Sequence, residues 1–258
     1  MTGGLLPAVR GAIGFLSRIP IGRETRDWEA FERTPTAFPL SGYVIGALIG
    51  LPVAVVAAIG VPAASVAVVG LLAVYAVAGI NNLDGLLDLG DAAVVHGDPD
   101  ERVAVLKDTT VGVGAIAVAV AALVALAFGF YGLGRVGSTA VFAVVIAAEV
   151  GAKLSMAAVA CVGTARHEGL GSAFTTNADR NDLAVPALVS LPVVAVGAPV
   201  GAVVPVAAAL LGAFLGGGLL AAWANRLLGG VNGDVFGAAN EIARLAGLHV
   251  GVIAWTLS

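Results

Sequence analysis

Charged residues are scarce in this chain. Asp, Glu, Lys and Arg make up only 12% of its 258 residues, whereas 59% are hydrophobic and the mean hydropathy is +1.00. Soluble domains carry about 25% charged and about 45–50% apolar residues, so this chain has too few polar side chains to cover a folded surface in water. The composition argues against a large soluble enzyme, a nucleic-acid-binding protein and a disordered protein.

Cysteine and basic charge are also in short supply. Cys161 is the only cysteine, which excludes an internal disulfide and a cysteine-rich metal site. A net charge of −4 and a pI of about 5.3 give no basic surface for nucleic acid. The first residues, Met1–Ser17, carry Arg10 in their middle and do not match a cleavable signal. We therefore expect the first membrane span to direct insertion.

Long apolar tracts are what the chain does have. Thr34–Leu83, Thr109–Gly134 and Leu183–Asn225 contain no Asp, Glu, Lys or Arg over 50, 26 and 43 residues. A transmembrane helix needs about 20 predominantly apolar residues, and runs without period-two alternation favour helices over strands. The sequence predicts an all-α, polytopic membrane bundle of about six to seven transmembrane helices, with residues 1–258 forming a single domain.

Turn residues and charges divide the chain into predicted helices. We expect a short amphipathic helix at Leu5–Ser17 and a final helix at Val231–Ser258, whose first half is polar, so that it either crosses the membrane as a seventh span or does not. Between them we expect six spans: Gly42–Gly60, Ala63–Ile80, Gly112–Phe130, Ser138–Ala160, Leu183–Val203 and Pro205–Ala224.

Lys and Arg divide unevenly between the two sides of such a bundle. With seven spans, one side receives eleven of these residues, in Met1–Ser41, Asn81–Val111, Gly163–Asp182 and Asn225–Arg244, and the other receives only Arg135. Cytoplasmic loops are enriched in Lys and Arg. We predict a multi-pass protein of the cell membrane whose active site faces the cytoplasm.

An acidic motif follows the second predicted span. Asp84, Asp88 and Asp91 are spaced i, i+4 and i+7, which places them on one face of a helix. Like charges one turn apart repel one another, and carboxylate oxygens are ligands that Mg²⁺, Mn²⁺ and Ca²⁺ prefer. The motif predicts a divalent metal site. The alternative is a solvated cap at a helix end.

Two further segments on the same side combine glycine with charge. Lys107 and Asp108 precede Gly112, where Asp108 could cap the next helix and exposed amides could hold a phosphate. Arg166 suits phosphate binding, whereas His167 is expected to be a surface residue. The alternative for the Gly112 segment is an ordinary capped helix start.

The remaining candidates lie in the fourth span and the final helix. Glu149 and Lys153, at i and i+4, predict an ion pair inside the bundle, either functional or structural. Asp234 follows Gly233 at the start of the final helix, and Glu241 lies two turns further along the same face. We expect Asp234 to face Asp84–Asp91 as a metal ligand or proton acceptor, the alternative being a helix cap.

Together these motifs resemble the cobalamin synthases, the adenosylcobinamide-GDP ribazoletransferases. The resemblance covers nearly the whole chain in ordered motifs: Phe15-Leu16-Ser17-Arg18-Ile19-Pro20, Phe38-Pro39-Leu40-Ser41-Gly42, Leu83 to Asp91, Lys107 to Gly112, Arg166 to Gly171, and Gly229 to Asp234. The chain departs from the family at Asn82 (often His), Leu87 (usually Ala) and Thr110 (commonly Arg). Asn82 in place of His argues against a His-based acid–base mechanism. Thr110 in place of Arg removes one expected phosphate contact, which Lys107 or Arg166 would then have to supply.

The resemblance implies a specific reaction. Adenosylcobinamide-GDP and α-ribazole, or its 5′-phosphate, would give adenosylcobalamin, or its phosphate, and GMP, with Mg²⁺ required. Asp84, Asp88, Asp91 and Asp234 would be catalytic, the first three as metal ligands, and the substrates would be bound by Arg18, Lys107, Asp108, Gly112, Arg166 and Gly233. The partners would be these substrates and the lipid bilayer, with no nucleic acid and the oligomeric state left open.

Two other functions share parts of the pattern. A CDP-alcohol phosphotransferase also uses acidic helix faces, but its motif continues Asp-Gly-x-x-Ala-Arg, whereas Asp84-Gly85-Leu86-Leu87 is followed by Asp88-Leu89. A cation transporter would place its acidic residues near the bilayer midplane, whereas these lie at the ends of spans.

Overall fold

The computed structural model describes residues 4–107, 110–136 and 138–258. These residues are helical, with no strand among them and one isolated bridge between Ala165 and Val231, so the predicted all-α class is confirmed. The elements are α1 (Leu5–Leu16), α2 (Thr25–Glu32), α3 (Ala37–Ala58), α4 (Ala63–Ala78), α5 (Asn81–Val94), α6 (Pro99–Leu106), α7 (Val113–Leu133), α8 (Ser138–Val162), α9 (Leu170–Thr175), η1 (Arg180–Leu183), α10 (Ala184–Ser190), η2 (Leu191–Val200), α11 (Val203–Leu228) and α12 (Gly233–Leu257).

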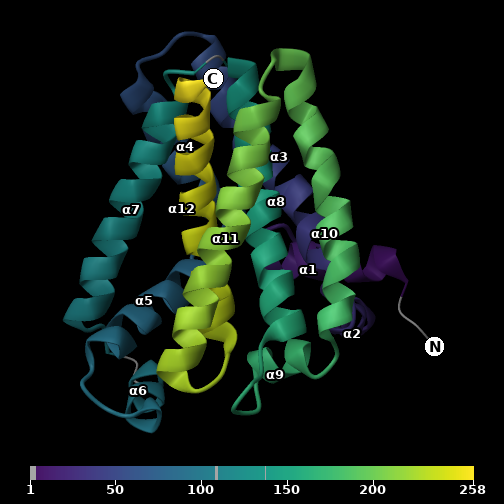
Figure 1. Cartoon of the computed structure of the whole chain (residues 1–258), viewed down its shortest axis with the longest axis vertical. Coiled ribbons are helices and arrows are strands. Elements are labelled where there is room, and N and C mark those ends of the chain that lie inside the picture. Colours follow the sequence, from purple (N-terminus) through teal and green to yellow (C-terminus); the bar gives the residue numbers. More distant parts are fainter. Residues whose placement is uncertain (1–3, 108–109, 137) are drawn as a thin grey trace.

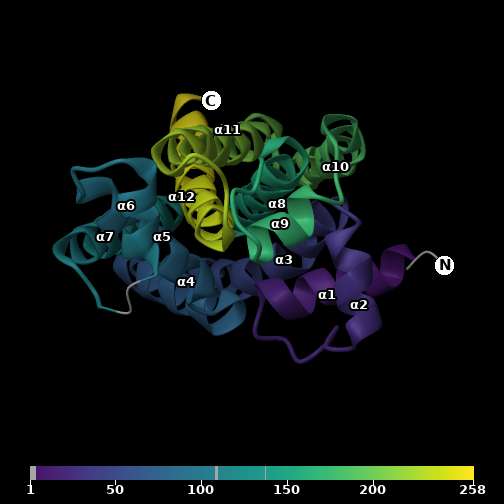
Figure 2. The same ribbon diagram turned by 90° about the horizontal axis from the view of Figure 1, so that it is seen from below.

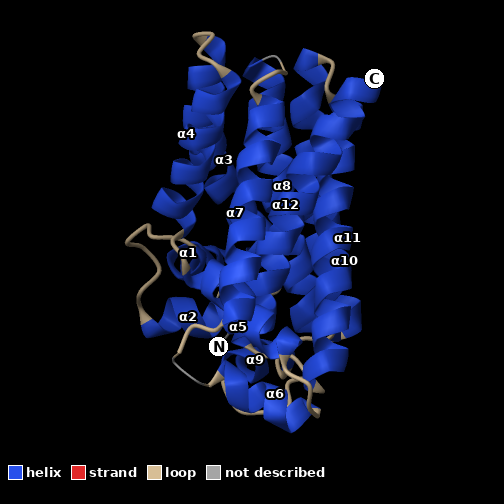
Figure 3. Ribbon diagram, turned by 90° about the vertical axis from the view of Figure 1, so that its left-hand side faces the viewer, coloured by secondary structure: helices blue, strands red, loops and turns tan. Residues whose placement is uncertain are grey.

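The two ends of the bundle differ in what connects the helices (Figures 1 and 3). One end, drawn at the bottom of Figure 1, carries α2, α5, α6 and α9, and we call it the polar end. The opposite end carries the short connections after α3, α7 and η2, together with the C-terminus. The arrangement agrees with the predicted division of the loops between two sides.

Five helical segments of the described chain are long and apolar enough to cross a membrane, and a sixth arises if α4 and α5 count as one broken span. The five are α3, α7, α8, the segment η1–η2 (Arg180–Val200) and α11. Helix α12 is about 37 Å long from its 25 residues and lies beside α11 in the bundle. Helix α12 is not one of the five apolar spans, because it contains charged residues.

The second predicted span ends earlier than expected. Helix α4 stops at Ala78, and α5 leaves it at an angle of 99°, so the acidic motif, which was predicted to follow the span, lies on a separate helix at the polar end. Gly79 makes the break because its φ of 75° is a left-handed conformation that residues with a Cβ rarely adopt.

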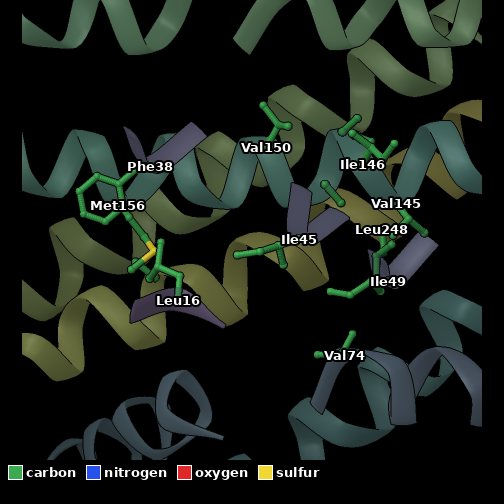
Figure 4. Close-up of a cluster of buried hydrophobic side chains, with 14 of the residues drawn as sticks. Leu16, Phe38, Ile45, Ile49, Val74, Val145, Ile146, Val150, Met156 and Leu248 are labelled. Atoms are coloured by element: carbon green, nitrogen blue, oxygen red, sulfur yellow. The ribbon is translucent and has the colours of Figure 1, made fainter. Parts of the chain in front are cut away.

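Helix α8 forms the centre of the bundle and is buried along most of its length (Figure 2). Glycines bring its neighbours close: a Cβ added at Gly42 of α3 would lie 2.9 Å from the Val150 Cα atom. Such small residues are how helices approach one another in lipid. The core continues through Ile45, Ile49 and Leu248 (Figure 4).

Candidate active site

Helix α5 crosses the start of α12 with almost no space between the two backbones. A Cβ added at Gly85 would lie 2.8 Å from the Asp234 Cα atom, and one added at Gly237 would lie 3.0 Å from the Asn82 Cα atom. Only glycine permits this approach. The crossing confirms the expectation that the start of the final helix meets the acidic helix.

The carboxylates at this crossing perturb one another. Burial, together with the negative charges of Asp234, Asp84 and Asp91, raises the pKa of Asp88 to about 6. Burial and the charge of Asp84 also raise the pKa of Asp234, against the lowering effect of a hydrogen bond from Asn232. Asp84, Asp88 and Asp234, which we call the acidic site, therefore favour a bound proton or cation.

Asp91 has a different role from its neighbours on α5. Its carboxylate oxygens accept hydrogen bonds from the backbone amides of Gly112, at 2.7 Å, and Ala115, at 2.8 Å, at the start of α7. The N-cap residue of α7 is Gly112, and Asp108, which was predicted to cap this helix, lies outside the described residues. The anion at these amides is therefore the Asp91 carboxylate, in the place where a phosphate was predicted, and it links α5 to α7.

The start of α12 is capped by Asn232. Its Oδ1 atom accepts a hydrogen bond from the Val235 amide at 3.1 Å, and its Nδ2 atom donates one to Asp234 Oδ2 at 2.8 Å. Gly233 is the first residue of the helix. The alternative of Asp234 as the N-cap is therefore wrong, because the Asn232 side chain caps the helix and also donates a hydrogen bond to the Asp234 carboxylate.

The donor chemistry of the acidic site suits a hard divalent cation, since Asp84, Asp88 and Asp234 offer only oxygen atoms. The raised pKa values of Asp88 and Asp234 are also what crowded carboxylates show without a counter-charge. In the described part of the chain, however, no three Asp, Glu, His or Cys side chains are gathered as a ligand set. Metal binding stays a prediction, and its remaining ligands must come from substrate or water.

The predicted substrate-binding cations lie around the polar end. Arg18 is exposed beside Gly79, and its backbone amide donates to the Val77 carbonyl at 2.8 Å. Lys107 is exposed at the end of α6. Arg166 pairs with Asp100 of α6 at 2.8 Å and donates to the Leu228 carbonyl at 3.2 Å, which ties α6 to the end of α11.

A small cavity of about 70 Å³ adjoins the acidic site, and sequence reasoning missed it. Its walls come from the end of α1, the α4–α5 junction, α8 and the starts of α9 and α12. They are lined by Phe15, Leu16, Ala78, Asn81, Asn82, Met156, Leu170, Gly233, Phe236 and Gly237. The lining residues are scattered through the sequence, so no local pattern signals the cavity.

The predicted Glu149–Lys153 pair is confirmed within a larger buried network. Lys153 Nζ lies 2.7 Å from Glu149 Oε2 and 2.8 Å from Asn240 Oδ1, while Arg244 pairs with both Glu149 and Glu241. The expectation that Glu241 forms an acidic face with Asp234 is therefore wrong, and Arg244, which was counted among the residues of the cytoplasmic side, is buried. Two acids and two bases neutralise one another inside the bundle, which favours the structural interpretation.

Known proteins similar to this chain point to one activity. The profile of the family described as cobalamin-5-phosphate synthase matches residues 8–252. An adenosylcobinamide-GDP ribazoletransferase from Halorubrum lacusprofundi is 48% identical over 98% of this chain and 99% of its own length. The protein of the same name from Haloquadratum walsbyi is 40% identical over 98% of this chain and 100% of its own length. The one from Halobacterium salinarum is 54% identical over 72% of this chain and 92% of its own length. No solved structure matches.

Proposed function

The chain belongs to the cobalamin-5-phosphate synthase family, and we propose that the carboxylates where α5 crosses α12 carry out its reaction. The activity is that of an adenosylcobinamide-GDP ribazoletransferase, a late step of cobalamin synthesis. It joins adenosylcobinamide-GDP to α-ribazole or α-ribazole 5′-phosphate and releases GMP. The observation that carries the site assignment is the group of mutually repelling carboxylates at one glycine-mediated crossing.

The chemistry is transfer of a phosphate-linked group. The 3′-hydroxyl oxygen of ribazole forms a bond to the phosphorus attached to cobinamide, the bond from that phosphorus to the GMP oxygen breaks, and GMP leaves with the electron pair. The hydroxyl proton needs an acceptor close to neutral pH. We assign this role to Asp234, because burial raises its pKa and Asn232 fixes its position.

Asp84 and Asp88 would hold Mg²⁺, which, when bound, neutralises diphosphate charge and stabilises the leaving phosphate. Asp91 acts through position: its hydrogen bonds to the Gly112 and Ala115 amides hold the acidic face of α5 against α7. Arg18 and Lys107, both exposed at this end, would bind substrate phosphates.

We also infer that the polar end faces the cytoplasm of a cell membrane. Of the eleven Lys and Arg residues assigned to that side, ten remain once the buried Arg244 is removed, and the other side has Arg135. This asymmetry supports the orientation, which also gives soluble nucleotide substrates access to the acidic site.

Purified protein in detergent, supplied with adenosylcobinamide-GDP, α-ribazole and Mg²⁺, tests the proposal. We expect equal amounts of cobalamin product and GMP, and loss of both when EDTA removes the metal. Turnover that is unaffected by EDTA would contradict the metal assignment. Release of CMP from a CDP-alcohol would favour the phospholipid alternative, and ion flux without nucleotide turnover would favour the transporter.

A further inference from the structure

The cavity of about 70 Å³ lies directly beside the proposed proton acceptor. Gly233, which precedes Asp234, forms part of its wall, and so do Asn81 and Asn82, which precede Asp84 on α5. The residues that bring α5 and α12 together, Asn82 and Gly237, also form its inner surface. A molecule in the cavity would therefore lie next to the acidic site.

The walls of the cavity are mostly apolar and partly aromatic. Phe15 and Phe236 line it, and both belong to a group of rings in mutual contact: Phe15 lies 5.1 Å from Trp28, and Phe174 lies 5.4 Å from Phe236, between ring centroids. Leu16 and Met156 also line it, and both belong to the buried hydrophobic cluster drawn in Figure 4. The only polar side chains in the lining are the amides of Asn81 and Asn82.

The apolar and aromatic lining indicates which part of the two substrates the cavity can bind. Guanine presents several donors and acceptors, and leaving them unpaired in an apolar cavity would cost free energy. A dimethylbenzimidazole ring is flat and apolar and has one free acceptor nitrogen, which one asparagine amide can satisfy. Aromatic walls also give such a ring favourable offset or edge contacts.

We propose that the cavity binds the benzimidazole base of ribazole and directs the attached ribose toward Asp234. The proposal rests on the proposed function and adds the location of the acceptor substrate. With the base in the cavity, the sugar hydroxyls extend past Gly233 to the acidic site, where the cobinamide-linked phosphorus is expected.

The cavity must widen to admit the base. A cavity of about 150 Å³ is known to bind benzene, and this one is about half that volume. Phe15 can open it, because this residue is 38% exposed at the protein surface, whereas Phe236 in the same lining is 1% exposed. Met156 adapts easily, since its unbranched side chain has several rotatable bonds. Phe15 thus closes over the base when it is bound.

Two matched substitutions of the full chain test the proposal. Ala78→Leu fills the cavity, and Ala54→Leu makes the same change in the open apolar groove between α3, α8 and η2, away from the site. We expect Ala78→Leu to raise the KM for α-ribazole and the Kd for radiolabelled α-ribazole by about tenfold or more, with the KM for adenosylcobinamide-GDP unchanged. Ala54→Leu should change none of these values.

A second variant covers the case in which Ala78→Leu does not fold. Phe15→Leu keeps an apolar wall but removes the ring, and we expect several-fold weaker binding of α-ribazole alone, measured by equilibrium dialysis without the other substrate. An increase in the KM for adenosylcobinamide-GDP instead would assign the cavity to guanine or the corrin ring and overturn the proposal. Unchanged α-ribazole binding in both variants would also overturn it, even if the enzyme is fully active and the proposed function stands.

Discussion

Gly85 of α5 lies directly against the backbone of Asp234 of α12, so that a Cβ at Gly85 would come within 2.8 Å of the Asp234 Cα and carbonyl oxygen atoms. We predict that Gly85→Ala pushes the two helices apart and lowers kcat at least about tenfold, since a displacement of about 1 Å can cost about a hundredfold in rate. GMP release per folded molecule measures this.

Gly218→Ala on α11 is the matched control. A Cβ at Gly218 meets nothing within 4 Å, and alanine favours helix by about 1 kcal/mol over glycine. Its activity should equal that of the unsubstituted protein. Equal activity in Gly85→Ala would show that the close crossing is dispensable.

Asp234→Ser separates catalysis from helix capping. Because Asn232 caps α12, loss of the Asp234 carboxylate should leave the thermal midpoint nearly unchanged while removing most of the turnover. Asn232→Ala should do the opposite in part, lowering the free energy of unfolding by about 1 kcal/mol. If Asp234→Ser stays fully active, Asp234 is not the proton acceptor.

Asp91→Ala is expected to act on stability and α7, not on metal affinity. The substitution leaves the Gly112 and Ala115 amides without their acceptor, which costs about 1–3 kcal/mol when such groups are buried. Hydrogen exchange at the start of α7 should accelerate, and the Mg²⁺ concentration for half-maximal rate should stay close to that of the unsubstituted protein. A large rise in that concentration would make Asp91 a metal ligand.

Glu149→Gln should destabilise the bundle strongly. Removing this carboxylate leaves Lys153 and Arg244 with one buried acid between them, and breaking a buried pair costs about 3–5 kcal/mol. The exposed Glu29→Gln on α2 is the control and should have little effect. Similar denaturation curves for the two variants would contradict the buried network.

The spans and the acidic helix were predictable, but their meeting points were not. Charge-free tracts define helices such as α3 and α11 within a few residues, because bilayer burial imposes a length and an apolar composition. The 99° break at Gly79 was missed, since one glycine among 36 carries no local signal of its backbone conformation. The spacing of the aspartates indicated one face of a helix.

Tertiary contacts decide the roles that the sequence left open. The spacing of Asp91 from its neighbours does not show that its carboxylate accepts hydrogen bonds from the backbone amides of Gly112 and Ala115, 21 and 24 residues later. Likewise, the sequence counts Arg244 among the charges of the cytoplasmic side, and only the packing of α8 shows Glu149 as its partner. The aromatic lining of the cavity unites Phe15 and Phe236, which are far apart in the sequence.

The pH dependence of GMP release by Asp88→Asn tests the central claim most directly. The pKa of Asp88 is raised to about 6 by burial and by neighbouring negative charges, so the carboxylate is ionised above pH 6 and the rate of the unsubstituted protein should fall as the pH drops through that value. Asp88→Asn should stay folded, lose most of its rate and lose the part of the pH dependence that comes from Asp88. Near-normal turnover by Asp88→Asn, with the fall near pH 6 retained, would contradict a reaction centred on the α5–α12 carboxylates.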